Sequence, residues 1–471
     1  MEILYTPKRR IGLTEEEGWH KIGANGEKER WTEMNTEKIN EALFQYIDNS
    51  PTAFHAVAET ARRLEAAGYV KLEKEEGAEI FRKGKYYLTK NGSSLIAFRM
   101  PDGDVKKLRI SAAHSDSPCF KVKETPEMDV EGHYTRLNVE GYGGMIQSTW
   151  LDRPLSVAGR VIIQTQEGLT ERLVRFDRDL CVIPNLAIHF NREVNKGYAY
   201  NPQVDLLPLF SGGKGKEESL NSLKELCAGE LGVDPQCILA SDLYLYNRES
   251  GRRMGVNGEF IGSPRLDDLQ CAFGTLEGFL AAGEAETKCQ EKGDAGCCAV
   301  YALFDNEEIG SGTKQGADST FLEDVIGLIC SGAGISHSGR RDLLSESFLL
   351  SADNAHGVHP NHPEKSDPTN RPYLNGGIVL KFQGSQKYTT DAWSAAVVRR
   401  ICAQENIPCQ NFANRSDIAG GSTLGNISSA HVSIPAADIG LAQLAMHSAF
   451  ETAGAEDTAY LAAFSEAYFR G

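Results

Sequence analysis

The 471-residue sequence lacks an apolar run of the roughly 18 residues that a membrane-spanning helix requires. Its first ten residues, MEILYTPKRR, lack the apolar core of a secretory signal peptide. A basic stripe is also missing: 49 Lys and Arg stand against 65 Asp and Glu, and the net charge of −16 would repel a phosphate backbone. We therefore expect a soluble, cytoplasmic protein that binds neither membranes nor nucleic acid.

Sequence patterns of several other protein classes are absent too. The 11 cysteines are odd in number and include no C-x-x-C spacing, so we expect reduced thiols and not a disulfide framework. The polar tract at 211–218 lacks the G-x-x-x-x-G-K-[ST] spacing of a phosphate-binding loop, and it predicts a flexible loop. Apolar residues make up 41% of the chain, which is typical of a globular protein, and its length allows two or more domains.

The chain changes character along its length. Short β-rich segments, broken by Gly and Pro, predict an inserted domain at about 122–255. The surrounding domain must then be discontinuous, with parts at 1–121 and 256–471. Residues 1–36 are polar and charged, and we expect them to form an extension that packs on the surface. Ser50-Pro51 predicts the start of a helix that ends at Gly68.

One apolar run ends abruptly in two adjacent carboxylates, Glu307 and Glu308. Such a pair repels and loses hydration unless a cation compensates the charge. With a metal ion bound, one carboxylate can serve as a ligand while its neighbour takes a proton from water. Taken alone, the pair is more typical of a solvated turn, because most acidic pairs lie on protein surfaces.

Four further apolar runs precede residue types that bind metals. They are 108–113 before His114, 261–266 before Asp267 and Asp268, 348–352 before Asp353, and a possible strand at 432–434 upstream of His447. The carboxyl ends of strands are where open α/β sheets build their sites, so we expect these side chains to meet. Imidazole and carboxylate ligands together suit zinc, with manganese or cobalt as substitutes.

These residues lie in motifs that follow one another as HSDSP (114–118), RLDDL (265–269), DNEEIGS (305–311), SADNAHGVHPN (351–361) and AMHS (445–448). In this order, from about residue 40 to the end of the chain, they resemble the M18-family metalloaminopeptidases, the aspartyl aminopeptidase group. The resemblance implies a three-layer α/β/α metallopeptidase domain with an inserted β-rich dimerization domain. It also implies two zinc ions per chain and hydrolysis of the N-terminal residue of peptides.

The resemblance implies a role for each motif residue, with one zinc ion bound by His114 and Asp353, the other by Glu308 and His447, and both by Asp267. Glu307 becomes the general base. Asp116 lies two residues beyond His114 and is expected to accept the other ring N–H of that histidine. The family often has Asn where this chain has Asp268, so the choice of Asp267 as the bridge depends on the register of the motif.

Substrate selection depends on a second set of residues. Lys381 follows an apolar run at 377–380, and Tyr388 comes seven residues later. In aspartyl aminopeptidases a Lys and a Tyr at this spacing contact an acidic N-terminal side chain, as a cation beside a phenol suits a carboxylate. His356 matches the family motif and is expected to line the pocket. An edge lysine and a packing tyrosine fit the same pattern, and some members prefer neutral residues such as Leu.

The resemblance extends to assembly. In the family the inserted domain mediates dimerization and lends a histidine to the neighbouring active site, which implies that role for His189 in the sequence Leu-Ala-Ile-His. Its expected function is a hydrogen bond to the oxyanion, although the local pattern alone favours a structural histidine. In the family, such dimers assemble into tetrahedral dodecamers, so the resemblance implies the same assembly here. Another two-metal hydrolase, such as a deacylase, and a non-catalytic assembly protein on the same fold remain as alternatives.

Overall fold

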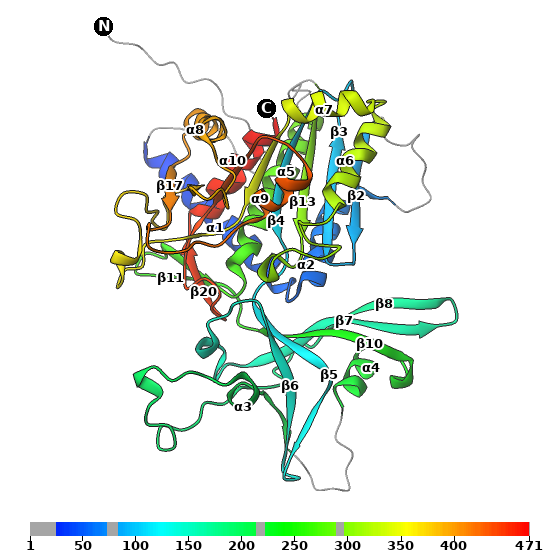
Figure 1. Ribbon diagram of the computed structural model, residues 1–471, viewed down its shortest axis with the longest axis vertical. Coiled ribbons are helices and arrows are strands. Elements are labelled where there is room, and N and C mark those ends of the chain that lie inside the picture. Colours follow the sequence, from blue (N-terminus) through cyan, green and yellow to red (C-terminus); the bar gives the residue numbers. More distant parts are fainter. Residues whose placement is uncertain (1–24, 73–82, 213–221, 289–295, 471) are drawn as a thin grey trace.

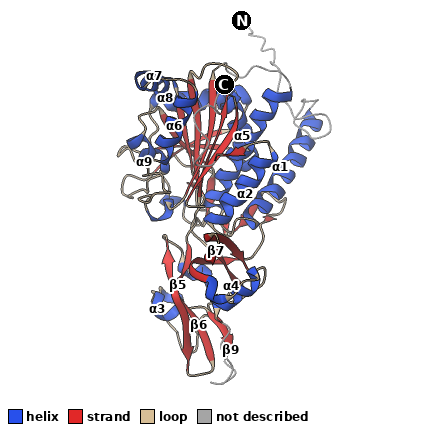
Figure 2. Cartoon of the chain, turned by 90° about the vertical axis from the view of Figure 1, so that its right-hand side faces the viewer, coloured by secondary structure: helices blue, strands red, loops and turns tan. Residues whose placement is uncertain are grey.

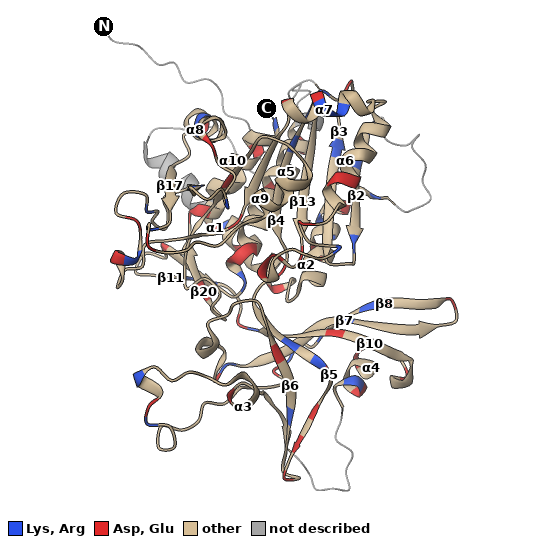
Figure 3. Ribbon diagram, in the orientation of Figure 1, with Lys and Arg blue, Asp and Glu red and all other residues tan. Residues whose placement is uncertain are grey.

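The computed structural model describes residues 25–72, 83–212, 222–288 and 296–470, which form two stacked parts (Figure 1). The upper part contains a nine-stranded sheet between helices, and the lower part contains a six-stranded sheet. Within these ranges, none of the helices is both long enough and apolar enough to cross a membrane. Lys and Arg are interspersed with Asp and Glu over both parts (Figure 3).

The nine-stranded sheet is parallel at its centre. Its strands, in spatial order, are β1 (Val70–Lys71), β2 (Gly84–Lys90), β3 (Ser94–Met100), β13 (Cys297–Phe304), β4 (Lys107–His114), β14 (Phe348–Ala352), β18 (Ala436–Gly440), β16 (Ile378–Phe382) and β17 (Cys409–Ala413). The four central strands β13, β4, β14 and β18 run parallel, with β3 and β16 antiparallel beside them. The central strands are buried over most of their length, as parallel strands covered on both faces are.

Helices cover both faces of this sheet (Figure 2). One hydrophobic core includes residues of α1 (Asn25–Asp48), α2 (Ala53–Ala66), α5 (Leu266–Lys288), α8 (Ala392–Glu405) and α10 (Asp457–Arg470). The other includes residues of α6 (Phe321–Gly332), α7 (His337–Glu346) and α9 (Leu424–His431). Successive strand residues alternate between the two cores: Leu303 packs into the first, and Ala302 and Phe304 into the second. The predicted α/β class is therefore confirmed, with three layers.

The lower part is an antiparallel sheet with a core of its own. Its strands, in spatial order, are β8 (Gly168–Arg175), β7 (Leu155–Thr165), β10 (Ile238–Asn247), β5 (Cys119–Val130), β6 (Tyr134–Tyr142) and β9 (Leu209–Gly212). Short helices accompany it: η2 (Gln147–Trp150), η3 (Val194–Lys196), α3 (Pro202–Asp205), α4 (Leu223–Leu231) and η4 (Pro235–Cys237). This sheet thus begins directly after β4 and returns the chain to the upper part after β10.

A third sheet of five short strands lies beside the nine-stranded sheet. Its strands, in spatial order, are β11 (Arg252–Met254), β12 (Phe260–Ser263), β20 (Glu451–Gly454), β19 (Ala442–Leu444) and β15 (Ala355–His356). Because β12 and β20 pair, the chain before α5 is joined to the chain near the C-terminus. The sequence did not predict this sheet, since its strands are two to four residues long and owe their pairing to segments far away in the chain.

Local predictions near the N-terminus were only partly right. The helix predicted from Ser50 starts later, because α1 ends at Asp48 and Thr52 is the N-cap of α2. Gly68 follows α2 with a φ of +83°. Residues 1–24 lie outside the described residues, but 25–36 belong to α1. Most of the loop predicted at 211–218 also lies outside, and only Ser211 and Gly212 are seen, at the end of β9.

Candidate active site

Three central strands end at predicted metal ligands. His114 is the last residue of β4, and Asp353 follows β14 directly. Glu307 and Glu308 begin the short helix η5 (Glu307–Ile309), three residues after the end of β13. Because these strands are parallel neighbours, the carboxyl ends of all three meet at one edge of the sheet.

The other two predicted ligands follow strands of the five-stranded sheet. Asp267 lies four residues after β12, at the start of α5, and His447 lies three residues after β19 with a φ of +66°. The strand expected at 432–434 is wrong: β18 begins at Ala436, and β19 is the strand that precedes His447. One buried carboxylate, that of Glu451, accepts the backbone N–H of Asp267 at 3.0 Å and that of His447 at 2.7 Å. Glu451 therefore holds both segments in place.

Asp267 lies between the two histidines. Its Oδ1 is 3.5 Å from Nε2 of His114, and its Oδ2 is 3.4 Å from Nε2 of His447. The same Nε2 of His447 is 3.3 Å from Oε2 of Glu308. Potential ligand atoms form three overlapping groups, each within 4.8 Å. They are His114, Asp267, Asp268 and Asp353; His114, Glu307 and Glu308; and Asp267, Glu308 and His447. Asp267 belongs to the first and the third of these groups.

Buried carboxylate oxygens in this cluster have lone pairs to offer. Oδ1 of Asp267 and Oε1 of Glu308 have no hydrogen-bond partner among the described residues. Unpaired buried oxygens are costly unless a cation contacts them, so the donor set fits divalent ions. Oδ1 of Asp268 is also without a partner among the described residues, but its Oδ2 accepts the backbone N–H of His114 at 3.1 Å.

Each histidine presents its Nε2 to the cluster because its Nδ1 has another partner. Nδ1 of His447 is 2.7 Å from the backbone carbonyl oxygen of Gly144. Nδ1 of His114 is 3.1 Å from the backbone carbonyl oxygen of Asp116 and 3.5 Å from its carboxylate. The ring N–H of His114 thus has the backbone oxygen of Asp116 as its nearer acceptor, and the carboxylate of the same residue lies farther away. These bonds set the tautomers in which Nε2 can bind metal.

The carboxylate of Asp116 instead holds the glutamate pair. Its two oxygens accept the backbone N–H groups of Glu307 and Glu308, each at 3.1 Å. The hydroxyl of Tyr142 also donates to it at 2.7 Å, and Tyr142 accepts from Asn306 at 2.8 Å. Asp116 therefore fixes the turn that presents both glutamates.

Burial and neighbouring charge shift the acidity of the cluster. Burial, reinforced by nearby carboxylates such as Asp353, raises the pKa of Glu307 to about 8. Burial and Asp267 also raise the pKa of Glu308 well above its usual value. For Asp267, burial acts upward, but the facing imidazoles of His114 and His447 hold its pKa well below the usual range. Burial thus disfavours the charged form of both glutamates unless a cation compensates the charge, which again fits a metal site.

Comparison with known proteins gives the family of this chain. Residues 46–469 match the family model for aminopeptidase I zinc metalloproteases (M18). The chain belongs to the M18 family. It is 44% identical to a probable M18 family aminopeptidase 2 of Clostridium acetobutylicum, over 91% of this chain and 97% of the relative, and 40% identical to one of Pseudomonas aeruginosa, over 92% and 98%. The predicted family and activity class, a zinc metalloaminopeptidase, are thereby confirmed.

Solved structures agree with this M18 chain in fold. A structure of the Ape4 and Nbr1 complex aligns with a TM-score of 0.89 and 32% identity, covering 94% of this chain and 87% of the other. The S. cerevisiae mApe1 dodecamer aligns with a TM-score of 0.79 and 26% identity, covering 92% and 97%. The M18 aminopeptidase of Thermotoga maritima, at 23% identity and a TM-score of 0.78 over 93% and 97%, shows the same fold.

The predicted substrate residues of this M18 chain lie beside Asp353. Lys381 is within β16, not after it, and its side chain is only 2% exposed. Its ammonium donates to the backbone oxygen of Asn354 at 2.8 Å and lies 3.3 Å from Oδ2 of Asp353. The same ammonium is 5.5 Å from the ring centroid of the buried Tyr388. His356 lies in β15 and packs on Phe412, with ring centroids 6.1 Å apart.

His189 lies apart from these residues, in an exposed turn of the lower part. The described metal-ligand groups do not include it. Three large apolar side chains around it are also exposed, namely Leu186, Ile188 and Phe190 at 56%, 53% and 81%. Within one chain, the structure therefore does not bring His189 into the cluster.

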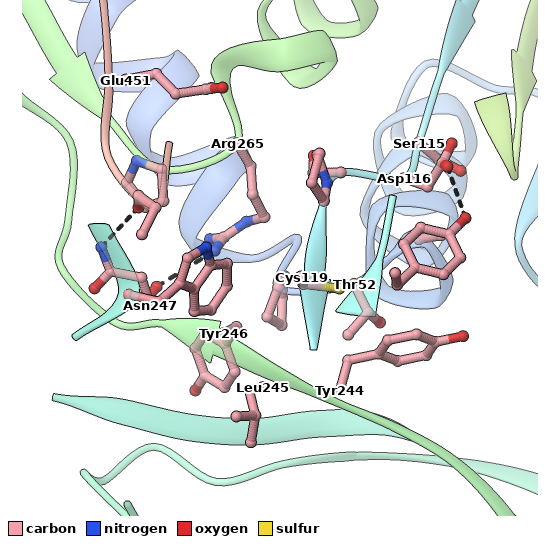
Figure 4. Close-up of a pocket in the computed structure, with 18 of the residues that line it drawn as sticks. Thr52, Ser115, Asp116, Cys119, Tyr244, Leu245, Tyr246, Asn247, Arg265 and Glu451 are labelled. Atoms are coloured by element: carbon pink, nitrogen blue, oxygen red, sulfur yellow. Dashed lines mark hydrogen bonds between the residues drawn. The ribbon is translucent and has the colours of Figure 1, made fainter. Parts of the chain in front are cut away.

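Sequence reasoning missed two residues that organise the site, Glu451 and Tyr142. Glu451 lies four residues after His447 and marks no motif, and Tyr142 belongs to the six-stranded sheet. A cavity of about 50 Å³ adjoins the cluster and is lined by Asp116, Arg265 and Glu451, among others (Figure 4). None of the five predicted ligands lines it, so it lies behind the supporting carboxylates.

Proposed function

We propose that this M18 aminopeptidase binds two zinc ions per chain and that Asp267 bridges them. The observation that supports it most directly is the placement of the Asp267 oxygens, one 3.5 Å from His114 and the other 3.4 Å from His447. A shared carboxylate is how two-metal sites hold their ions about 3.5–4 Å apart. The remaining ligands would be Asp353 beside His114 and Glu308 beside His447, and manganese or cobalt can replace zinc.

The residues around the ions would supply the proton chemistry. Two zinc ions bound there would polarise the scissile carbonyl and lower the pKa of water towards neutrality. Glu307 would accept a proton from the attacking water at its carboxylate and return it to the nitrogen of the leaving amine. The backbone N–H groups of Glu307 and Glu308 both donate to the carboxylate of Asp116, which fixes the position of the base relative to the metal ligand.

Metal content tests this proposal. The purified chain should bind about two divalent ions, and chelators should abolish hydrolysis of aminoacyl chromophores with free N-termini. Asp267→Asn should lose both ions, whereas His114→Ala or His447→Ala should weaken mainly one. Asp268→Asn is the matched control and should keep both ions, because the carboxylate of Asp268 accepts a hydrogen bond from the backbone N–H of His114. Loss of both ions from Asp268→Asn, with Asp267→Asn fully loaded, would assign the bridge to Asp268. Activity in metal-free protein would refute the proposal.

We further propose a preference for acidic N-terminal residues. An ammonium has three N–H donors, and that of Lys381 has described acceptors at Asn354 and Asp353. A third donor is therefore open to a substrate carboxylate, next to the phenol of Tyr388. The deep burial of Lys381 supports the alternative, in which it neutralises Asp353 and the pocket accepts neutral residues such as Leu. Relative kcat/KM on Asp, Glu, Leu and Met substrates distinguishes the two.

We also propose that the enzyme works as an oligomer. The six-stranded sheet, within the inserted domain at about 122–255, would mediate dimerization and bring His189 to the neighbouring site, where it would bind the oxyanion. The exposed apolar residues around His189 support this, because such patches mark interfaces. Dimers would assemble into a tetrahedral dodecamer, a size supported by the likeness to the mApe1 dodecamer. The joint presence of base and ligands disfavours a purely non-catalytic assembly role.

A further inference from the structure

Asp438 is a fully buried carboxylate that has no part in the site described so far. It lies in β18, between the strand that leads to Asp353 and the strand that carries Lys381. The pairing of β18 with β16 ends at Ile439 and Leu380, so Asp438 and Lys381 are the next residues on the two strands. A buried carboxylate needs hydrogen-bond donors, and Asp438 has three, from two separate segments of the chain.

Two of the donors come from the segment that follows the proposed substrate residue Tyr388. The backbone N–H of Thr389 donates to Oδ2 of Asp438 at 2.5 Å, and the hydroxyl of Thr389 donates to the same oxygen at 2.8 Å. The next residue, Thr390, accepts the backbone N–H of Asp438 on its Oγ1 at 2.9 Å. The chain directly after Tyr388 is therefore attached to β18, while the Tyr388 ring centroid lies 5.5 Å from the ammonium of Lys381.

The third donor comes from a glycine-rich loop, residues 419–423, which leads into helix α9. The hydroxyl of Thr423 donates to Oδ1 of Asp438 at 2.5 Å. Thr423 is the N-cap residue of α9, yet its side chain makes no capping bond to the helix. A threonine at this position ordinarily accepts a backbone N–H of the first turn. Thr423 instead uses its hydroxyl to join the glycine-rich loop to Asp438.

Gly425 allows the first turn of α9 to close over this carboxylate. A Cβ at Gly425 would lie 2.8 and 2.9 Å from the two carboxylate oxygens of Asp438, and 2.9 Å from Cβ of Ser351. A side chain at this position would therefore push the helix away, whereas glycine lets α9 cover the carboxylate and its three hydrogen bonds.

We propose that Asp438 is a positioning residue for substrate selection, which holds Tyr388 in place and ties its segment to the glycine-rich loop. The inference rests on the proposed function, in which Lys381 and Tyr388 contact the side chain of the N-terminal residue of the substrate. Selective contacts need a supporting set of hydrogen bonds that fixes their geometry, and Asp438 supplies one for Tyr388. Asp438 acts through Tyr388 and does not touch the substrate. A tie that only stabilises the fold would lower the melting temperature and leave substrate selection unchanged.

The test uses the zinc-loaded full-length protein and four aminoacyl chromophores, with N-terminal Asp, Glu, Leu and Met. Thr423→Val and Thr389→Val each remove one hydroxyl donor to Asp438 and nearly keep the shape of the side chain. Each should reduce the ratio of kcat/KM between the most and the least favoured substrate by roughly 2- to 10-fold, as the loss of one hydrogen bond predicts. The change should appear mainly in KM, with the zinc content of the wild type.

Two further variants serve as controls. Thr423→Ser keeps the hydroxyl and should retain the wild-type ratio. Ser429→Ala removes a hydroxyl that bonds within α9, to the backbone oxygen of Gly425, and should also behave like the wild type. Asp438→Ala removes all three bonds and should reduce the ratio further; if it does not fold, the two threonine variants decide. The ratio compares substrates on one preparation, so a partly unfolded variant does not distort it.

A double-mutant cycle measures whether the effect passes through Tyr388. In a Tyr388→Ala background, Thr423→Val should leave the ratio unchanged, because the side chain that Asp438 positions is gone. An unchanged ratio in both Thr423→Val and Thr389→Val, or the same reduction with and without the Tyr388 side chain, would overturn the proposal. A wild type that prefers Leu would contradict the acidic preference alone, since the ratio is defined for either order of substrates.

Discussion

Glu451 allows a sharp test of how the two-metal site is held together. Its carboxylate is 2% exposed and accepts the backbone N–H groups of Asp267 and His447, at 3.0 and 2.7 Å. Glu451→Gln keeps the size of the side chain but retains only one acceptor oxygen. The amide nitrogen then faces a backbone N–H, so one charge-assisted bond is replaced by two opposed donors.

The size of the effect follows from that single lost bond. A hydrogen bond to a charged group contributes about 1.5–3 kcal/mol, which is roughly 10- to 150-fold in an equilibrium constant. Loss of a group that orients metal ligands typically weakens metal binding by about 10- to 100-fold, a range that overlaps this value. Since Glu451 touches no predicted ligand atom, the loss should appear in metal affinity, and activity should return at high free zinc.

The assay is a zinc titration against a competing chelator, with activity followed at each free zinc concentration. Glu456→Gln, an exposed carboxylate five residues away, is the matched control and should bind zinc like the wild type. Thermal unfolding of metal-free protein separates a general loss of stability from a loss of affinity. An unchanged zinc affinity in folded Glu451→Gln, or a lost activity that saturating zinc does not restore, would refute the reasoning.

Three further predictions concern the general base Glu307, the proposed substrate-selecting residue Lys381 and the oligomer. The glutamine of Glu307→Gln cannot accept a proton, so kcat should fall by roughly 10² or more while the protein still binds about two metal ions. If the variant loses metal, Glu307 is a metal ligand and not the base. Lys381→Leu should reduce the preference for Asp and Glu over Leu by roughly 10- to 150-fold in relative kcat/KM. Lys387→Leu, at an exposed lysine, is the control and should leave this preference unchanged. If the wild type already prefers Leu, Lys381 is not the residue that selects the substrate. Chains with His189→Ala and chains with Glu307→Gln should each be nearly inactive, yet regain partial activity when mixed under subunit exchange, with His133→Ala as an active control. No recovery, with both variants folded and metal-loaded, would place His189 outside the neighbouring site.

Local signals in the sequence were enough for much of the fold and for the choice of candidate ligands. The apolar runs before His114, Asp353 and Glu307 are central parallel strands, which stay apolar because helices cover both of their faces. The α/β class itself was implied by the resemblance to the M18 family, with these apolar runs as the candidate strands. The start of α2 was missed because α1 ends only four residues before Thr52, and the chain between them belongs to neither helix.

The sequence by itself determined which residue types could bind metal and which strands lead to them, since ligand chemistry and hydrophobic pattern are both local properties. Only the tertiary structure decided how they meet. The five-stranded sheet joins the segments of Asp267 and His447, which are 180 residues apart, and Glu451 bonds both. The tertiary structure likewise placed Lys381 beside Asp353 and the Asp116 carboxylate beside the glutamate pair. Such contacts arise from packing between distant segments, and no local pattern specifies which of several possible partners a buried charge will find.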